Sequence, residues 1–125
     1  MKSALICDDD QHIRDLVQAI LESNGYTVIA AENGKCACTI LEDRKIQKNT
    51  SLIILDVRMP EMTGLDVLDR VKEMNCIDHI PIIMLTAEDS HTDIMLGYEK
   101  GATYYITKPF TKQQLLYGVS LVTSD

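Results

Sequence analysis

The stretch SLIIL, residues 51–55, followed directly by Asp56, indicates the fold more clearly than any other part of the sequence. Its apolar residues stand at consecutive positions instead of alternating with polar ones. PIIML, residues 81–85, is a second run of this kind. Strands in the middle of a parallel sheet are covered by helices on both faces, so their sequences are apolar throughout. The two runs therefore predict the central strands of a parallel β-sheet.

Strand-like and helix-like stretches alternate along the whole chain. The predicted strands span residues 3–7, 26–31, 51–55, 81–85 and 103–106. A helix is predicted after each strand: around residues 13–21, near 35–44, after a cap at Thr63, near 90–100, and after a cap at Thr111. The pattern predicts an α/β fold in which five helices cover both faces of a five-stranded parallel sheet. The strand at 26–31 mixes polar and apolar residues and fits an edge of the sheet.

The first predicted helix has the clearest amphipathic pattern. Its apolar residues recur at helical spacing and should form one buried face: Ile13, Leu16, Val17, Ile20 and Leu21. Two glycines, Gly25 and Gly101, follow predicted helices and are placed to end them. Asp66 and Gln114 stand three residues after the capping threonines, which is the spacing of a capping box.

The composition is that of an acidic globular chain. It has 125 residues, of which 46% are hydrophobic and 25% charged, and a formal net charge of −7. This length suits one domain, residues 1–125, with one core. The net charge argues against direct binding to nucleic acid, and no apolar run approaches the roughly 20 residues of a membrane helix. The cysteines and histidines form no zinc pattern, and no secretory signal is evident, so we expect a cytoplasmic protein.

Polar side chains capable of chemistry follow four of the predicted strands. Asp8 and Asp9 come after the first strand, Asp56 after the third, Thr86 after the fourth and Lys108 near the end of the fifth. In open α/β sheets the carboxyl ends of the strands lie at one edge, and ligands bind there. The sequence therefore predicts that three carboxylates, a hydroxyl and an ammonium group converge on one rim.

This set of side chains suits phosphoryl transfer to a carboxylate. Asp8, Asp9 and Asp56 offer the oxygen ligands that Mg²⁺ prefers. We expect Asp56 to lie deepest, at the end of the most apolar strand, and to act as the nucleophile that forms an aspartyl phosphate. Thr86 and Lys108 would bind other phosphoryl oxygens. A cation among the aspartates would explain why like charges stand together.

Four motifs at these strand ends resemble those of the receiver domains of two-component response regulators, including the chemotaxis-regulator type. They are CDDD at 7–10, LDVRMPEMTGLD at 55–66, LTAE at 85–88 and TKPF at 107–110. The resemblance covers almost the whole chain. It implies a flavodoxin-like fold with strand order 2-1-3-4-5 and a bacterial signalling domain, not an ordinary enzyme. A sensor histidine kinase or histidine phosphotransfer protein would phosphorylate Asp56, and an output domain or downstream protein would respond.

The same resemblance implies how the metal site is built. Mg²⁺, or Mn²⁺ as its substitute, would bind Asp9, Asp56 and the backbone carbonyl of Arg58. Asp8 would act mainly through a metal-bound water. Arg58 and Glu88 would flank the phosphoryl group and influence how fast water removes it.

The resemblance also implies a conformational switch. Thr86 would move toward the phosphoryl group, and the aromatic ring of Tyr105 would turn inward. The surface formed by the last two helices and the last strand would then change its binding preference. The bond between Lys108 and Pro109 is expected to be cis, although the general frequency of cis X-Pro bonds is only about 5%.

The last predicted helix is apolar on two sides. One side would pack on the sheet: Leu115, Val119 and Val122. Leu116 would lie on the flank of this stripe, and Tyr117 and Leu121 would face away from the sheet. No charged residue lies between Lys112 and Asp125. A cluster of exposed apolar residues indicates an interface, so we expect these residues to contact a second copy of the chain or an output domain.

Three other functions fit parts of the pattern. A haloacid-dehalogenase-type phosphatase also uses a nucleophilic Asp, but in a D-x-D-x-[TV] pattern after the first strand, and here His12 occupies the last position. A nucleotide- or flavin-binding module would carry a glycine-rich phosphate motif, which is absent. A receiver-like domain that is never phosphorylated usually lacks one of the acids, the Thr or the Lys, and all are present here.

Overall fold

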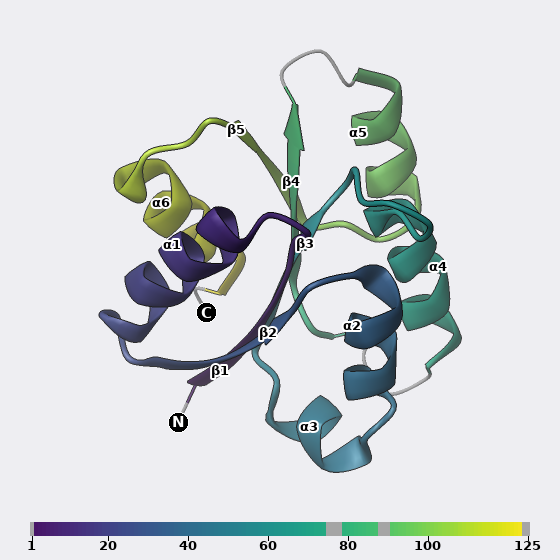
Figure 1. Cartoon of the computed structure of the whole chain (residues 1–125), viewed down its shortest axis with the longest axis horizontal. Coiled ribbons are helices and arrows are strands. Elements are labelled where there is room, and N and C mark those ends of the chain that lie inside the picture. The colour runs from purple at the N-terminus through teal and green to yellow at the C-terminus, as the bar shows by residue number, and fades with distance from the viewer. Residues whose placement is uncertain (1, 75–78, 88–90, 124–125) are drawn as a thin grey trace.

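The computed structural model describes residues 2–74, 79–87 and 91–123 (Figure 1). Its centre is a five-stranded parallel sheet with strand order β2-β1-β3-β4-β5, which confirms the predicted order. The strands are β1 (Lys2–Cys7), β2 (Tyr26–Ala31), β3 (Leu52–Asp56), β4 (Ile82–Ala87) and β5 (Tyr104–Lys108). The helices are α1 (Gln11–Glu22), α2 (Gly34–Leu41), α3 (Arg44–Asn49), α4 (Gly64–Glu73), α5 (His91–Glu99) and α6 (Lys112–Thr123).

The sheet separates two hydrophobic clusters, and helices cover both faces (Figure 1). On one face, α1 and α6 pack against residues such as Ile54 and Ile83. On the other, α2 and α4 pack against residues such as Ile53 and Met84. Successive residues of a strand point to opposite faces, so the middle of a central strand is apolar at consecutive positions. Every residue of β3 is buried, as the sequence of SLIIL predicts.

The predicted helix ends are present in the structure. Thr63 and Asp66 form a capping box at the start of α4. Thr111 and Gln114 exchange the same pair of hydrogen bonds before α6. The two glycines predicted to end helices have positive φ, the left-handed conformation that glycine adopts at low cost: Gly25 at 89° and Gly101 at 109°.

Two expectations about helices are wrong. The described residues contain six helices instead of five, because the helix expected near 35–44 ends at Leu41 and the short α3 follows it. The Asp43 side chain accepts hydrogen bonds from the backbone N–H groups of Lys45 and Ile46, so it starts a new helix. In α1, Leu16 lies outside the buried face and is 45% exposed.

Two lysines connect α4 with the C-terminal end of α5. The Nζ atom of Lys100 lies 2.7 Å from a carboxylate oxygen of Asp69. The Nζ atom of Lys72 donates a hydrogen bond to the backbone carbonyl of Glu99 at 3.3 Å. Among the residues described, no helix combines the length and apolar character that crossing a membrane requires.

Candidate phosphoryl-acceptor site

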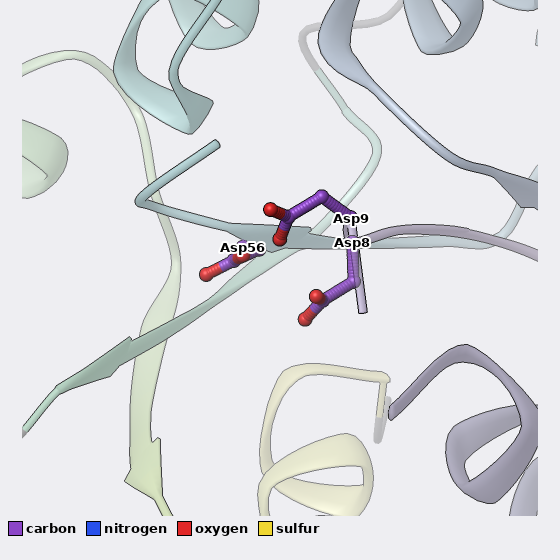
Figure 2. Close-up of side chains that lie close together, drawn as sticks. All are labelled: Asp8, Asp9 and Asp56. Atoms are coloured by element: carbon purple, nitrogen blue, oxygen red, sulfur yellow. The ribbon is translucent and has the colours of Figure 1, made fainter. Parts of the chain in front are cut away.

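The carboxyl ends of β1 and β3 bring three aspartates together (Figure 2). Carboxylate oxygens of Asp8, Asp9 and Asp56 lie within 4.8 Å of one another. Asp8 and Asp56 are buried, whereas Asp9 is exposed. Oxygen ligands at this spacing, two of them in a dry environment, fit a hard divalent cation such as Mg²⁺.

The side chain of Lys108, at the end of β5, lies between two of these carboxylates. Its Nζ atom is 2.9 Å from Oδ2 of Asp8 and 3.1 Å from Oδ1 of Asp56. The bond from Lys108 to Pro109 is cis in the structure. The ammonium group therefore offsets part of the negative charge that β1 and β3 place at this edge.

Backbone and side-chain donors hold the two buried carboxylates in place. The Asp10 N–H donates to Oδ1 of Asp8 at 2.9 Å, and the Arg58 N–H donates to Oδ1 of Asp56 at 3.3 Å. From α1, Nη1 of Arg14 donates to the backbone carbonyl of Asp8 at 2.8 Å. Arg14 belongs to no motif in the sequence, and nothing local to it indicates that its side chain reaches back to Asp8.

Gly64 lets the start of α4 approach the end of β3 closely. A methyl group on this residue would overlap the backbone carbonyl of Asp56. The Gly64 N–H donates a hydrogen bond to the carbonyl of Val57 at 2.9 Å. The close approach holds the backbone of the candidate nucleophile and of the residue after it.

Burial and like charge raise the pKa of Asp56 to about 7. The largest cause is burial, which disfavours the charged form, and the second is the charge of Asp8. Lys108 opposes both, and the neighbouring Asp9 adds to the rise. Burial acts to lower the pKa of Lys108, but its bonds to Asp8 and Asp56 outweigh that effect and raise it. A cation among the carboxylates would favour the ionised, nucleophilic form of Asp56.

Cys7, the residue before Asp8, is the last residue of β1 and is fully buried. Its thiol donates to the carbonyl of Asn33 at 3.2 Å, and its Sγ lies 3.6 Å from the sulfur of Met59. Burial, followed by the charge of Asp8, raises the pKa of this thiol to about 12. Cys7 is therefore a neutral packing residue beside the acidic cluster.

The structure places the remaining predicted residues as follows. Thr86 is buried in β4, opposite Thr107 in the β5 register, one residue before Lys108. Tyr105 is partly buried, with its ring against that of Tyr98. Arg58 is exposed, and Glu88 lies outside the described residues.

The predicted interface residues lie on α6, which packs on the face of the sheet that also carries α1 (Figure 1). Tyr117 is 61% exposed and Leu121 47% exposed, whereas Leu116 is partly buried.

The expectation that Asp56 lies deepest is wrong. Asp8 is 0% exposed and Asp56 is 4% exposed. The Lys108 ammonium group and the Asp10 backbone N–H both contact the carboxylate of Asp8. Lys108 pairs with both carboxylates, and Asp56 keeps the small exposed fraction that Asp8 lacks.

Comparisons with known proteins agree with this geometry. The family model for the response regulator receiver domain matches residues 4–120. The transcriptional regulatory protein CpxR of Escherichia coli is 37% identical over 116 residues, which are 93% of this chain and 47% of CpxR. The phosphate regulon transcriptional regulatory protein PhoB of Pseudomonas aeruginosa is 39% identical over 92% of this chain and 48% of PhoB. The chain therefore spans about half the length of these curated relatives.

Solved structures show the same similarity. The chemotaxis protein CheY4 of Vibrio cholerae is 36% identical and superposes with a TM-score of 0.87, over 98% of both chains. A receiver domain from Clostridium thermocellum has a TM-score of 0.88 at 25% identity, over 98% of this chain and 94% of that one.

Proposed function

The chain belongs to the response regulator receiver family, and from that premise we propose that Asp56 accepts a phosphoryl group from a phosphohistidine. The donor would be a sensor histidine kinase or a histidine phosphotransfer protein. The observation that carries the proposal is the position of Asp56: a carboxylate at the end of a buried strand, with Lys108 and two further aspartates around it. We also propose that residues 1–125 act as one receiver domain.

In the proposed transfer, an Oδ atom of Asp56 attacks the phosphorus. The P–N bond of the phosphohistidine breaks, its electron pair stays on the imidazole nitrogen, which takes up a proton, and an acyl phosphate forms on Asp56. Lys108 offsets negative charge on the phosphoryl oxygens, and the Thr86 hydroxyl donates a hydrogen bond to one of them. Bound Mg²⁺ would neutralise part of the transition-state charge.

The described donors suit the proposed metal. Asp9, Asp56 and the backbone carbonyl of Arg58 would hold Mg²⁺, and Asp8 would reach it through water. Mn²⁺, which takes similar oxygen ligands, would substitute. We further propose that Arg58 and Glu88 set how long the phosphoryl group persists, so that Arg58→Ala changes the hydrolysis rate severalfold.

The proposed output is a change of the surface over α5, β5 and α6, with Thr86 and Tyr105 as the switch. This surface would control an output domain or a downstream protein. The exposed apolar residues of α6 would contact that partner or a second copy: Leu116, Tyr117 and Leu121. Sedimentation with Mg²⁺ and beryllofluoride tests the second possibility. The wild type should dimerise and Tyr117→Glu/Leu121→Glu should not, whereas two monomeric proteins would exclude a homodimer.

The central experiment is incubation with acetyl phosphate and Mg²⁺, followed by intact mass measurement. The wild type should gain the mass of one phosphoryl group, and a chelator should prevent it. Asp56→Asn should gain none, because an amide is a poor nucleophile. Asp15→Asn, an exposed position on α1, serves as the matched control and should be labelled fully. Full labelling of Asp56→Asn would overturn the proposal.

A further inference from the structure

A glycine in the middle of α5 makes room for the ring of Tyr105. Gly97 is buried although its neighbours Leu96 and Tyr98 are exposed. A methyl group on residue 97 would overlap the hydroxyl oxygen of Tyr105 and lie 2.6 Å from its Cζ atom. The phenol ring of Tyr105 therefore packs against α5 at a residue without a side chain, because any Cβ atom there would occupy the same space.

Tyr98, the next residue of α5, closes this seat from one side. The ring centroids of Tyr98 and Tyr105 are 5.0 Å apart with an interplanar angle of 54°. Tilted aromatic pairs at this separation are attractive. Gly97 and Tyr98 together thus define one position of the Tyr105 ring, by space and by contact.

Glycine is otherwise a poor choice at this place. In the interior of a helix it is less favourable than alanine, because it loses more backbone freedom on folding. Residue 97 has ordinary helical conformation, without the positive φ of Gly25 or Gly101, so the backbone does not require glycine. The space taken by the Tyr105 ring is the feature that does.

The other face of the sheet provides a natural control. Tyr104 precedes Tyr105 in β5 and points to the opposite face, where Gly118 of α6 accommodates it. A methyl group on Gly118 would lie 3.1 Å from the Tyr104 ring and 2.9 Å from Cδ1 of Ile106. The same substitution can therefore be made against either tyrosine.

We propose that Gly97 is the residue that sets the resting position of Tyr105, and through it the surface over α5, β5 and α6. A methyl group at residue 97 removes the seat and displaces the ring toward solvent, with no phosphoryl group present. The regulatory meaning of this displacement rests on the proposed function of Tyr105. The displacement of the ring does not depend on that function. An experiment can therefore contradict the displacement and the proposed function separately.

The position of the ring is measured by fluorine NMR on the full chain labelled with 3-fluorotyrosine. Tyr→Phe variants assign the five tyrosine signals, and a neutral gadolinium chelate reports the exposure of each. In Gly97→Ala, the relaxation enhancement of Tyr105 should rise at least threefold without metal or phosphodonor. In Gly118→Ala, the Tyr105 signal should stay as in the wild type while that of Tyr104 changes. An unchanged Tyr105 signal in folded Gly97→Ala overturns the proposal.

A second measurement covers the case in which Gly97→Ala is too unstable for NMR. The melting temperature of Gly97→Ala should be lower than that of the wild type. In a Tyr105→Ala background the same substitution should raise it, by about 4 °C, because alanine is then only a better helix former. If Gly97→Ala changes the melting temperature in the same direction in both backgrounds, the proposed contact between Gly97 and the Tyr105 ring is contradicted. Asp56 phosphorylation, tested independently with acetyl phosphate, decides the proposed function alone.

Discussion

The middle of the sheet and its carboxyl edge are two residues apart in the same strand, and burial has opposite effects in them. Ile54 is 0% exposed among aliphatic side chains, and removing it from water stabilises the fold. Asp56 is 4% exposed, and burial makes its charged form less favourable. Burial in β3 thus stabilises the fold at the middle of the strand and destabilises it at the end of the strand.

The difference shows why the edge needs partners that the middle does not. Removing a carboxylate from water is unfavourable unless ion pairs and hydrogen bonds compensate for it. Here one ammonium group, Lys108, serves both Asp8 and Asp56. One ammonium group cannot balance three carboxylates, and this excess of negative charge is what would favour a bound cation at the edge.

The largest expected effect on stability comes from a substitution in the middle of β3. Ile54→Ala should lower the free energy of unfolding by about 3–4 kcal/mol, because a buried aliphatic side chain is replaced by a cavity. Urea titration of the metal-free protein measures this change. Leu121→Ala removes a comparable side chain from an exposed position and should cost less than about 1 kcal/mol. Equal losses would show that the two positions are not differently packed in solution.

Adding Mg²⁺ should raise the free energy of unfolding, because a cation offsets the repulsion between the carboxylates at the edge of the sheet. At a concentration 100 times its Kd, a ligand of the native state raises the free energy of unfolding by about 2.7 kcal/mol. Thermal melts with Mg²⁺ and with a chelator should show this increase in the wild type and in Asp15→Asn. Asp9→Asn should show a smaller increase, while melting slightly above the wild type without metal. The same increase in all three chains would count against Asp9 as a ligand.

The pH dependence of stability should isolate Asp56. Its pKa is about 7 in the folded chain against an ordinary 3.8, so between these values the folded state binds more protons than the unfolded state. The metal-free protein should therefore lose stability as pH rises through this window, by on the order of 2 kcal/mol. Asp56→Asn should lack this loss, which unfolding curves at several pH values would reveal. Parallel pH profiles for the two chains would place the titration elsewhere.

The smallest effect concerns the loop after β3. Glu61 has a φ of 68°, a left-handed conformation that is unfavourable for a residue with a Cβ atom. Glu61→Gly should raise the free energy of unfolding by about 0.5–1 kcal/mol. Glu61→Ala removes the same charge but keeps the Cβ atom, and should not stabilise. If the two variants behave alike in urea, the effect comes from charge and not from the backbone.

The features predicted correctly from the sequence were those written in local patterns. Consecutive apolar residues identify β3 and β4, and the threonine caps identify α4 and α6. The short α3 was missed because it has no apolar stripe: Gln47 is its only buried residue. Helical spacing shows which residues share a face of α1 but not where the buried part of that face ends, and Leu16 lies beyond that limit.

The candidate site was predictable as a set of residues, but not as a geometry. That Lys108 contacts Asp8, one hundred residues earlier, depends on how far a long side chain reaches across the strand ends. The depth of Asp8 and the bond from Arg14 also arise from packing between elements. The seat of Tyr105 on Gly97 was invisible for the same reason, since a glycine in a helix carries no sign of what fills the space beside it.

Cys7 lies at the boundary between the stable sheet and the charged edge, and its buried, protonated thiol allows the opening of this boundary to be measured by chemical labelling. Alkylating reagents need an accessible thiolate, which the closed fold does not offer here. Labelling of Cys7 can therefore proceed only when β1 transiently separates from its surroundings. The labelling rate of Cys7 in native buffer therefore measures how often this part of the sheet opens. Labelling should be slower when a bound cation holds the strand ends together.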